Sequence, residues 1–322
     1  MSVMSQEAGR VKFSSKWFNI LWVLVVLCLL WWVAEGYCIG ESLRLDGLIL
    51  ITTCGFVGNA LLKEEYRLTL FLALGVLSSF YFFSWTDALL LIGWSVALVG
   101  ILHLPLALFI RIGILFLIGI LFAAMKAGYI TDYIPSNVIT VIASLYMFRV
   151  IVYVYELRHK KVPIGWSERL AYFFMFPNIL IALFPVVDLK TFRNTYYQGS
   201  ESEIYLSGMN LICRGIMHLL LYRIIYLYAI PAVHEVESVW ALLQYVVMSY
   251  TLILRLSGTF HIAVGILRLF GFNLPEIFNN YFLANGFSDY WRRINIYWKD
   301  FLLKIFFYPV FFKLRWVSLF GD

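Results

Sequence analysis

The sequence predicts an all-α polytopic integral membrane protein. Of its 322 residues, 62% are hydrophobic and only 14% are charged, and the mean hydropathy is +0.83. A soluble domain has about one charged residue in four. A single soluble core cannot hide this excess of apolar residues, because a globular protein still needs a surface that is compatible with water. The apolar residues also gather in runs that are long enough to cross a bilayer as helices.

The first predicted membrane helix is Trp17–Ala34, which has eighteen residues and no charge. Basic residues precede it, as in a signal peptide, but the run is long for one and no small-x-small cleavage site follows. We therefore expect an anchored helix. Further apolar segments, some of them short enough to be tilted or re-entrant, lie near residues 47–62, 68–83, 87–102, 105–124, 136–155, 170–187, 204–230 and 238–271. We expect a helical bundle of roughly 8–10 membrane segments.

The basic residues predict the orientation. Residues 1–16 hold three basic side chains and are expected to form a cytoplasmic N-terminal tail. Six crossings then return the chain to the cytoplasm at Glu156–Arg169, the most basic short loop of the first half. The same count places Lys190 and Arg193 outside, so the second half is less regular. No soluble domain is embedded in the chain, and we expect one integral membrane domain over residues 1–322.

Charge and motifs exclude several classes of protein. The net charge of +6 and the pI near 9.0 fit basic loops that face anionic lipid. No motif for nucleic-acid binding appears, so no nucleic-acid partner is expected. The H-E-x-x-H, G-x-S-x-G and glycine-rich phosphate-loop motifs are also absent. The four cysteines form no C-x-x-C pair, and we expect neither a disulfide nor a metal site.

Several charged residues fall within or beside the apolar segments. An arginine at a lipid-exposed helix centre costs about 2.5–3.5 kcal/mol, so each must face the interior, pair, or reach the headgroups. Arg111 and Arg214 lie deepest in their runs, and we expect them to face the interior. His218 follows Arg214 by four residues and shares its helix face. For His218, hydrogen-bonded packing and membership of a site are both open.

Residues 288–305 read SDYWRRINIYWKDFLLKI and hold six charges in a chain that is otherwise poor in charge. At about 100° per residue, one continuous helix places these charges on one face and the apolar residues opposite. Asp289 with Arg293 and Asp300 with Lys304 are expected i,i+4 ion pairs. Such a helix lies at a membrane interface. We therefore predict a C-terminal amphipathic interfacial helix.

The surrounding region, residues 255–309, resembles the signature of the membrane-bound O-acyltransferase (MBOAT) family. It is most similar to the branch that acylates bacterial cell-wall and exported polysaccharides. That branch carries SG-x-x-D-x-A-x-G, LFGF-x-LP-x-NF, S-x-S-x-FWRRWHISL and W-x-RDYIY-x-PL in this order. The matching residues are Ser257, Gly258, Ala263, Gly265, Leu269 to Phe272, Leu274, Pro275, Phe278, Ser288, Asp289, Trp291, Arg292, Arg293, Asp300, Tyr308 and Pro309. Weaker likenesses extend the MBOAT-like region to residues 140–312.

The resemblance implies transfer of an acyl group, such as acetyl, from a thioester donor to a hydroxyl of a cell-envelope or exported polysaccharide. The donor would be acyl-CoA or an acyl carrier protein, used as a co-substrate without any bound cofactor. The implied setting is the bacterial cytoplasmic membrane, with an envelope subunit as a further partner. The implied catalytic residues are Asn295 and His261. The implied substrate-binding residues are Asp289, Trp291, Arg292, Arg293 and Asp300.

Two departures from the family pattern bear on activity. Asn295 stands where this branch has the histidine of WRRWH, and His261 stands where it has aspartate. The second histidine of the family lies on a later helix, and this chain has no histidine after His261. We therefore expect the chain to be truncated or inactive. A non-catalytic membrane scaffold of the same fold and a transporter stay open as alternatives.

Overall fold

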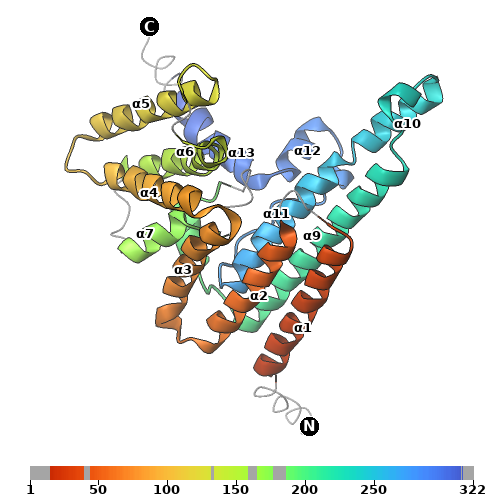
Figure 1. Ribbon diagram of the computed structural model, residues 1–322, viewed down its shortest axis with the longest axis horizontal. Coiled ribbons are helices and arrows are strands. Elements are labelled where there is room, and N and C mark those ends of the chain that lie inside the picture. The colour runs from red at the N-terminus through yellow and green to blue at the C-terminus, as the bar shows by residue number, and fades with distance from the viewer. Residues whose placement is uncertain are drawn as a thin grey trace, which may run out of the picture. The chain divides into compact units, whose positions relative to one another are not determined.

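A computed structural model describes residues 15–39, 44–131, 134–158, 165–176, 186–312 and 314. Over these residues the chain is helical, as predicted (Figure 1). The β-type contact in this part of the chain is an isolated antiparallel bridge between Tyr196 and Phe272. The all-α class is therefore confirmed for the described residues.

The helices form two compact units, each made of two separate stretches of the sequence. Unit 1 combines Met1–Leu62 with Thr195–Leu274. Its elements are α1 (Ser15–Gly36), α2 (Leu45–Leu61), α9 (Glu201–Tyr228), η3 (Val233–Glu235), α10 (Val239–Ser249) and α11 (Leu252–Leu269). Unit 2 combines Lys63–Asn194 with Pro275–Asp322. Its elements are α3 (Glu64–Phe82), α4 (Trp85–Leu102), α5 (Leu108–Lys126), α6 (Ser136–Arg158), α7 (Trp166–Phe173), α8 (Leu189–Asn194), η4 (Tyr281–Leu283), α12 (Phe287–Arg293), α13 (Ile296–Leu302) and the π-helical turn η5 (Leu303–Phe307). The expected single membrane domain stays a prediction.

Six stretches of helix in the described part of the chain are long and apolar enough to cross a membrane. They are Trp17–Gly36, Trp85–Leu102, Leu108–Lys126, Ser136–Arg158, Glu201–Tyr228 and Val239–Leu269. Helix α2 is apolar as well but shorter. These helices are compatible with a membrane protein, while the expected total of 8–10 membrane segments stays a prediction.

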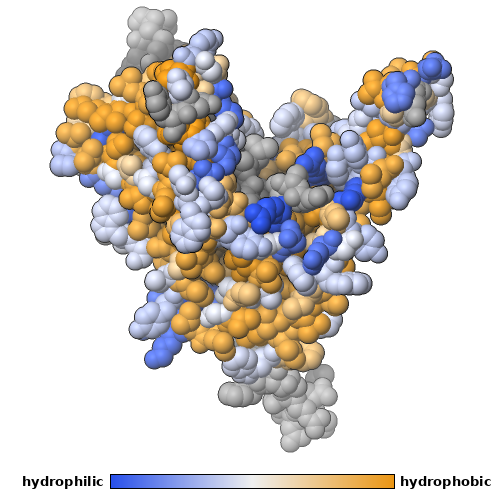
Figure 2. Space-filling model, in the orientation of Figure 1, coloured by the Kyte–Doolittle hydropathy of each residue, from blue (hydrophilic) through white to orange (hydrophobic). Residues whose placement is uncertain are grey.

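The outer surfaces of these helices are apolar. Figure 2 shows broad hydrophobic surface over α1 and α2 and over α4 and α5. On α1 the residue Phe18 is 66% exposed, and on α5 the residue Phe109 is 74% exposed. Water would hydrate such surfaces at a large cost in free energy, whereas lipid chains cover them without that cost. The exposed surface thus agrees with the composition.

Glycines hold α9 and α11 together in unit 1. A Cβ atom on Gly215 or on Gly258 would lie 2.7 Å from the carbonyl oxygen of the other residue. Gly208 and Gly265 form a second pair, in which the corresponding distances are 2.8 and 2.7 Å. Both helices repeat the glycine after seven residues, and the pairing is antiparallel. Small residues at this spacing let two helix backbones approach closely, which is how apolar helices associate when lipid surrounds them.

A buried asparagine ties α2 to the same pair of helices. The side chain of Asn59 has no exposed surface, and its Nδ2 donates to the hydroxyl of Tyr197 at 2.9 Å. The hydroxyl of Tyr205 and the carbonyl of Leu269 lie 3.4 Å from the same nitrogen. A buried amide is stable only with such partners. Asn59 therefore fixes how α2 packs within unit 1.

Among the described arginines of unit 2, Arg149 is the most deeply buried, at 3% exposure. Its Nη1 donates to the carbonyls of Tyr172 and Phe173 at 2.7 and 3.0 Å, at the C-terminal end of α7. A cation at this end satisfies carbonyls that have no partner within the helix. We expected Arg111 and Arg214 to have this interior role, but Arg111 is half-buried and Arg214 is exposed. Depth within an apolar run therefore did not predict burial.

The glycine contacts predict a clear substitution effect. Gly258→Ala should destabilise the protein by about 1–3 kcal/mol, because the added methyl group has to push α9 and α11 apart. Gly93→Ala in α4 is the control, since a Cβ there meets nothing within 4 Å. The control should be neutral or stabilising by up to about 1 kcal/mol. Thermal unfolding in detergent measures both, and equal effects would contradict the close helix approach.

The order of the helices predicts the topology of the first half. Six crossings by α1–α6 are an even number, and the number stays even without α2, which is short, and α3, which is charged at its start. A reporter fused after Lys161 should therefore lie on the same side as one fused at the N-terminus. Fluorescent and phosphatase reporters at both positions provide the measurement. Opposite locations would overturn this count.

Candidate functional site

The signature segment folds as two short helices and a π-helical turn. α12 ends at Arg293, Ile294 is extended with φ −88° and ψ 130°, and α13 follows Asn295. Asn295 is left-handed, with φ 44° and ψ 68°. The prediction of one continuous amphipathic helix over residues 288–305 is therefore wrong. The apolar periodicity continues across a break in the backbone, so the pattern alone does not reveal it.

Asn295 is the N-cap of α13. Its Oδ1 accepts a hydrogen bond from the backbone N–H of Trp298 at 3.2 Å. Asparagine is also one of the few residues besides glycine that readily adopt a left-handed conformation. The backbone N–H of Ile296 donates to the carbonyl of Ile277 at 3.0 Å, which fixes the break against the preceding segment. The fold alone thus explains an asparagine at this position.

One of the two predicted ion pairs of this segment forms. Nε of Arg293 lies 2.9 Å from Oδ2 of Asp289, as the i,i+4 spacing predicts. This hydrogen bond from Arg293 lowers the pKa of Asp289. The predicted pair of Asp300 with Lys304 is wrong, because Nζ of Lys304 lies 2.7 Å from Oδ2 of Asp188 instead. The change from α13 to the π-helical turn η5 lies between Asp300 and Lys304, so the two side chains do not have the spacing of a regular helix.

The other predicted substrate-binding residues, Trp291, Arg292 and Asp300, are exposed. Nε of Arg292 donates to the backbone carbonyl of Ser288 at 3.3 Å, and Asp300 pairs with Lys299 at 3.1 Å. These are local contacts on the surface of α12 and α13. They leave the side chains accessible to a ligand but do not orient them toward one.

An apolar groove of about 650 Å³ runs along α12, α13 and η5. It is lined from Trp291 to Leu314, and its lining is aliphatic and aromatic except for Asn295 and Lys299. The groove therefore brings together two of the predicted site residues, Trp291 and Asn295. Its shape and lining suit an apolar chain with one polar group at the position of the amide.

His261 lies in the interior of unit 1, at 5% exposure. Its Nδ1 is 2.6 Å from the carbonyl of Ser257 and 3.2 Å from the hydroxyl of the same residue. That hydroxyl is also 3.1 Å from Nδ1 of His218, and the two imidazole rings are 5.3 Å apart. A nitrogen that faces a carbonyl oxygen must donate, so Nε2 is the basic atom of neutral His261. His261 belongs to unit 1, whereas Asn295 belongs to unit 2.

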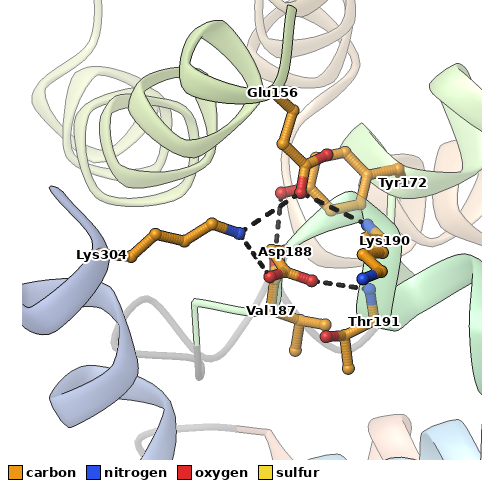
Figure 3. Close-up of polar contacts among 7 residues, drawn as sticks. All are labelled: Glu156, Tyr172, Val187, Asp188, Lys190, Thr191 and Lys304. Atoms are coloured by element: carbon orange, nitrogen blue, oxygen red, sulfur yellow. Dashed lines mark hydrogen bonds and ion pairs between the residues drawn. The ribbon is translucent and has the colours of Figure 1, made fainter. Parts of the chain in front are cut away.

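Figure 3 shows a charge cluster of unit 2 that the sequence did not predict. Nζ of Lys304 lies 2.7 Å from Asp188 and 3.6 Å from Oε1 of Glu156, whose side chain is 8% exposed. Oδ1 of Asp188 also accepts the N–H of Thr191 at 2.6 Å, at the start of α8. Through these ion pairs, Lys304 connects η5 to α6 and to the beginning of α8.

Within the cluster, Asp188 and Lys304 are stabilised in their charged forms. Burial opposes ionisation of Asp188, but hydrogen bonds from Lys304 and Thr191 outweigh it and lower the pKa of this carboxyl. Burial also opposes the charge of Lys304, but the hydrogen bond to Asp188 and the two nearby carboxylates raise the pKa of the ammonium. The partners of Lys304 are 116 and 148 residues away in the sequence, and no local pattern links them.

Comparisons of the chain with protein-family models, with curated proteins and with solved structures find no match. The acyltransferase resemblance therefore depends on the motifs of residues 255–309 and stays a prediction. The groove beside Asn295 and the contact of the buried His261 with the half-buried His218 are the two arrangements in the described residues that bear on it.

The charge cluster predicts a pH-dependent effect. Lys304→Gln should destabilise the protein by about 1–3 kcal/mol at neutral pH, because two carboxylates lose their shared cation. The lowered pKa of Asp188 means that this stabilisation is present above the ordinary carboxyl pKa and disappears as the pH falls below it. The raised pKa of Lys304 means that the stabilisation is fully present below the ordinary lysine pKa and is lost only as the pH rises through the raised pKa. Unfolding in detergent between pH 3 and pH 8 should therefore show the wild type and the variant converging in acid.

Lys299→Gln is the matched control, since Lys299 pairs with an Asp300 side chain that is 62% exposed. Exposed pairs contribute about 0–1 kcal/mol, so the control should change stability little at any pH. A destabilisation of Lys304→Gln that is equal at pH 3 and pH 7 would show that packing, not the charge cluster, is responsible.

Proposed function

We propose that the protein is a membrane-bound O-acyltransferase, which transfers a short acyl group from a thioester donor to a hydroxyl of a cell-envelope polysaccharide, although the two departures from the family pattern lead us to expect a truncated or inactive chain. The observation that carries this proposal is the position of Asn295, which stands in the WRR-containing motif and borders the apolar groove. An interfacial segment of this kind, α12 and α13, would lie at the bilayer surface, within a bundle of roughly 8–10 membrane segments. The setting is a bacterial cytoplasmic membrane, with the N-terminus in the cytoplasm.

In this reaction the hydroxyl oxygen of the acceptor attacks the carbonyl carbon of the thioester. The new C–O bond forms, the C–S bond breaks, and the proton moves from the hydroxyl to a base and finally to the departing thiolate. A general base contributes about 10²–10⁴-fold in rate. His261 is the histidine of the signature region, and its Nε2 is the basic atom of the neutral ring. The amide N–H of Asn295, in unit 2, is a hydrogen-bond donor of the kind that stabilises an oxyanion, and the roles of His261 and Asn295 are each proposed on their own.

A non-catalytic scaffold of the same fold is the second candidate. One observation favours it: the N-cap of α13 and the left-handed backbone account for Asn295 without any chemistry. The two candidates differ in what the amide nitrogen does, because the cap uses only the oxygen.

A series at position 295 separates the two candidates. Asn295→Asp keeps an oxygen for the cap and tolerates the left-handed backbone, but it removes the N–H donor. Asn295→Gly keeps the backbone conformation and removes the whole amide. If the protein is an acyltransferase, both substitutions should lower the rate of ester formation by about 10²–10³-fold. The stability of Asn295→Asp should stay close to that of the wild type.

The assay supplies acetyl-CoA or an acyl carrier protein thioester, with a polysaccharide acceptor, to the gene product in membranes. His261→Ala tests the base in parallel and should lower the rate of ester formation. Wild-type turnover in Asn295→Asp would reduce Asn295 to a helix cap. A wild type that forms no ester from either donor would favour the scaffold.

A further inference from the structure

Two arginines and a histidine of unit 2 meet where α4 ends. The Nε2 atom of His103, the C-cap of α4, lies 2.9 Å from the hydroxyl of Tyr153 on α6. Nδ1 of the same ring lies 3.5 Å from Nη1 of Arg169 on α7. Arg111, in the first turn of α5, turns back and donates to the carbonyl of Leu102, next to His103. Both guanidinium groups are therefore held beside one imidazole.

The imidazole is neutral in this arrangement. Nδ1 faces a guanidinium donor and so must accept, which leaves the proton on Nε2 for the hydroxyl of Tyr153. Burial, together with the charges of Arg169 and Arg111, lowers the pKa of His103. His103 thus tolerates the two cations but does not compensate for them.

Each arginine keeps an unused donor. The Nε atoms of Arg111 and Arg169 are buried and have no hydrogen-bond partner in the part of the chain that the structure describes. Arg169 lies over the ring of Trp166, with its Cζ 5.0 Å from the ring centroid, and this contact does not use Nε. A buried donor of a charged group without a partner costs about 1–3 kcal/mol or more.

The nearby carboxylates are engaged elsewhere. Glu168, next to Arg169 in the sequence, lies 3.5 Å from Nε of Arg193. Glu156, one turn beyond Tyr153 on α6, contacts Lys304 at 3.6 Å. The carboxylates near the two arginines therefore do not compensate their charges, and an anion from outside the described residues would do so.

We propose that Arg111 and Arg169, with the neutral His103 beside them, bind the phosphate group of an anionic ligand. Guanidinium groups match phosphate because their planar fork donates two parallel N–H bonds to adjacent oxygens. A phosphate offers enough oxygens for two such groups at once. The proposal stands on this geometry alone and does not depend on acyl transfer.

The position of the site limits the source of the phosphate. It lies toward the C-terminal ends of two candidate membrane helices, α4 and α6, beside α7. The positive-inside rule places these ends in the cytoplasm. A soluble phosphate ester, such as coenzyme A, and the headgroup of an anionic lipid both reach this surface, and both carry the required group.

Binding to the full chain in uncharged detergent tests the proposal with three probes: inorganic phosphate, coenzyme A and phosphatidylglycerol. Calorimetry measures the soluble probes, and native mass spectrometry counts retained lipid. Arg111→Gln and Arg169→Gln should each weaken binding of the effective probe at least about ten-fold. Arg158→Gln, which removes an exposed cation near the same end of α6, is the matched control and should change binding less than about three-fold.

Arg169→Lys keeps the charge and provides a second variant if a glutamine variant fails to fold, and it should also weaken binding because the fork is lost. Arginine-dependent binding of coenzyme A or phosphate identifies a soluble ligand, and arginine-dependent retention of phosphatidylglycerol alone identifies a lipid headgroup; both support the site. The proposal is overturned if the wild type binds none of the three probes, or if the control variant loses as much affinity as the two glutamine variants.

Discussion

The cost of placing charge among apolar helices decides where the polar residues of this chain lie. Three arginines meet this cost by donating to backbone carbonyls, and two of them, Arg149 and Arg111, do so where a helix ends. Arg149 binds the end of α7, Arg268 binds the carbonyl of Leu274 at 2.7 and 3.0 Å beyond α11, and Arg111 binds the end of α4. A terminal carbonyl has no partner within its helix and carries part of the negative end of the dipole. Each contact therefore compensates a cation and a carbonyl at once.

The two units solve the problem of helix association differently. In unit 1, glycine pairs bring the backbones of α9 and α11 together, and the polar groups Asn59, Ser257 and His261 are confined to that interior. In unit 2, polar side chains on one face of α6 carry contacts, since Arg149, Tyr153 and Glu156 recur at helical spacing and are all buried. Unit 1 thus has a close helix approach at paired glycines, and unit 2 adds the buried polar side chains of α6 to its own close approach, at Gly75 of α3.

The sequence predicted the helices of this chain much better than its candidate site. Long apolar runs determine where helices can lie, and helices formed in most of the expected segments. Hydrophobic periodicity could not show the break at Asn295, although an N-cap asparagine before IYWKDF is a signal that capping rules recognise. The contacts of Lys304 with Glu156 and of His103 with Arg169 join residues far apart in the chain. These contacts arise from tertiary packing, and no local pattern in a single sequence reveals them.

The break at Asn295 also explains how a groove can exist on this segment. A straight helix presents a convex ridge, so an apolar stripe from Trp291 to Leu314 would offer a ligand no hollow. The left-handed residue before α13 and the wider turn of η5 bend that stripe, and the hollow lies along it. Asparagine, aspartate and histidine are the non-glycine residues that most often adopt the left-handed conformation. Asparagine at this position therefore suits the bend, and with it the shape of the groove, whichever chemistry the side chain performs.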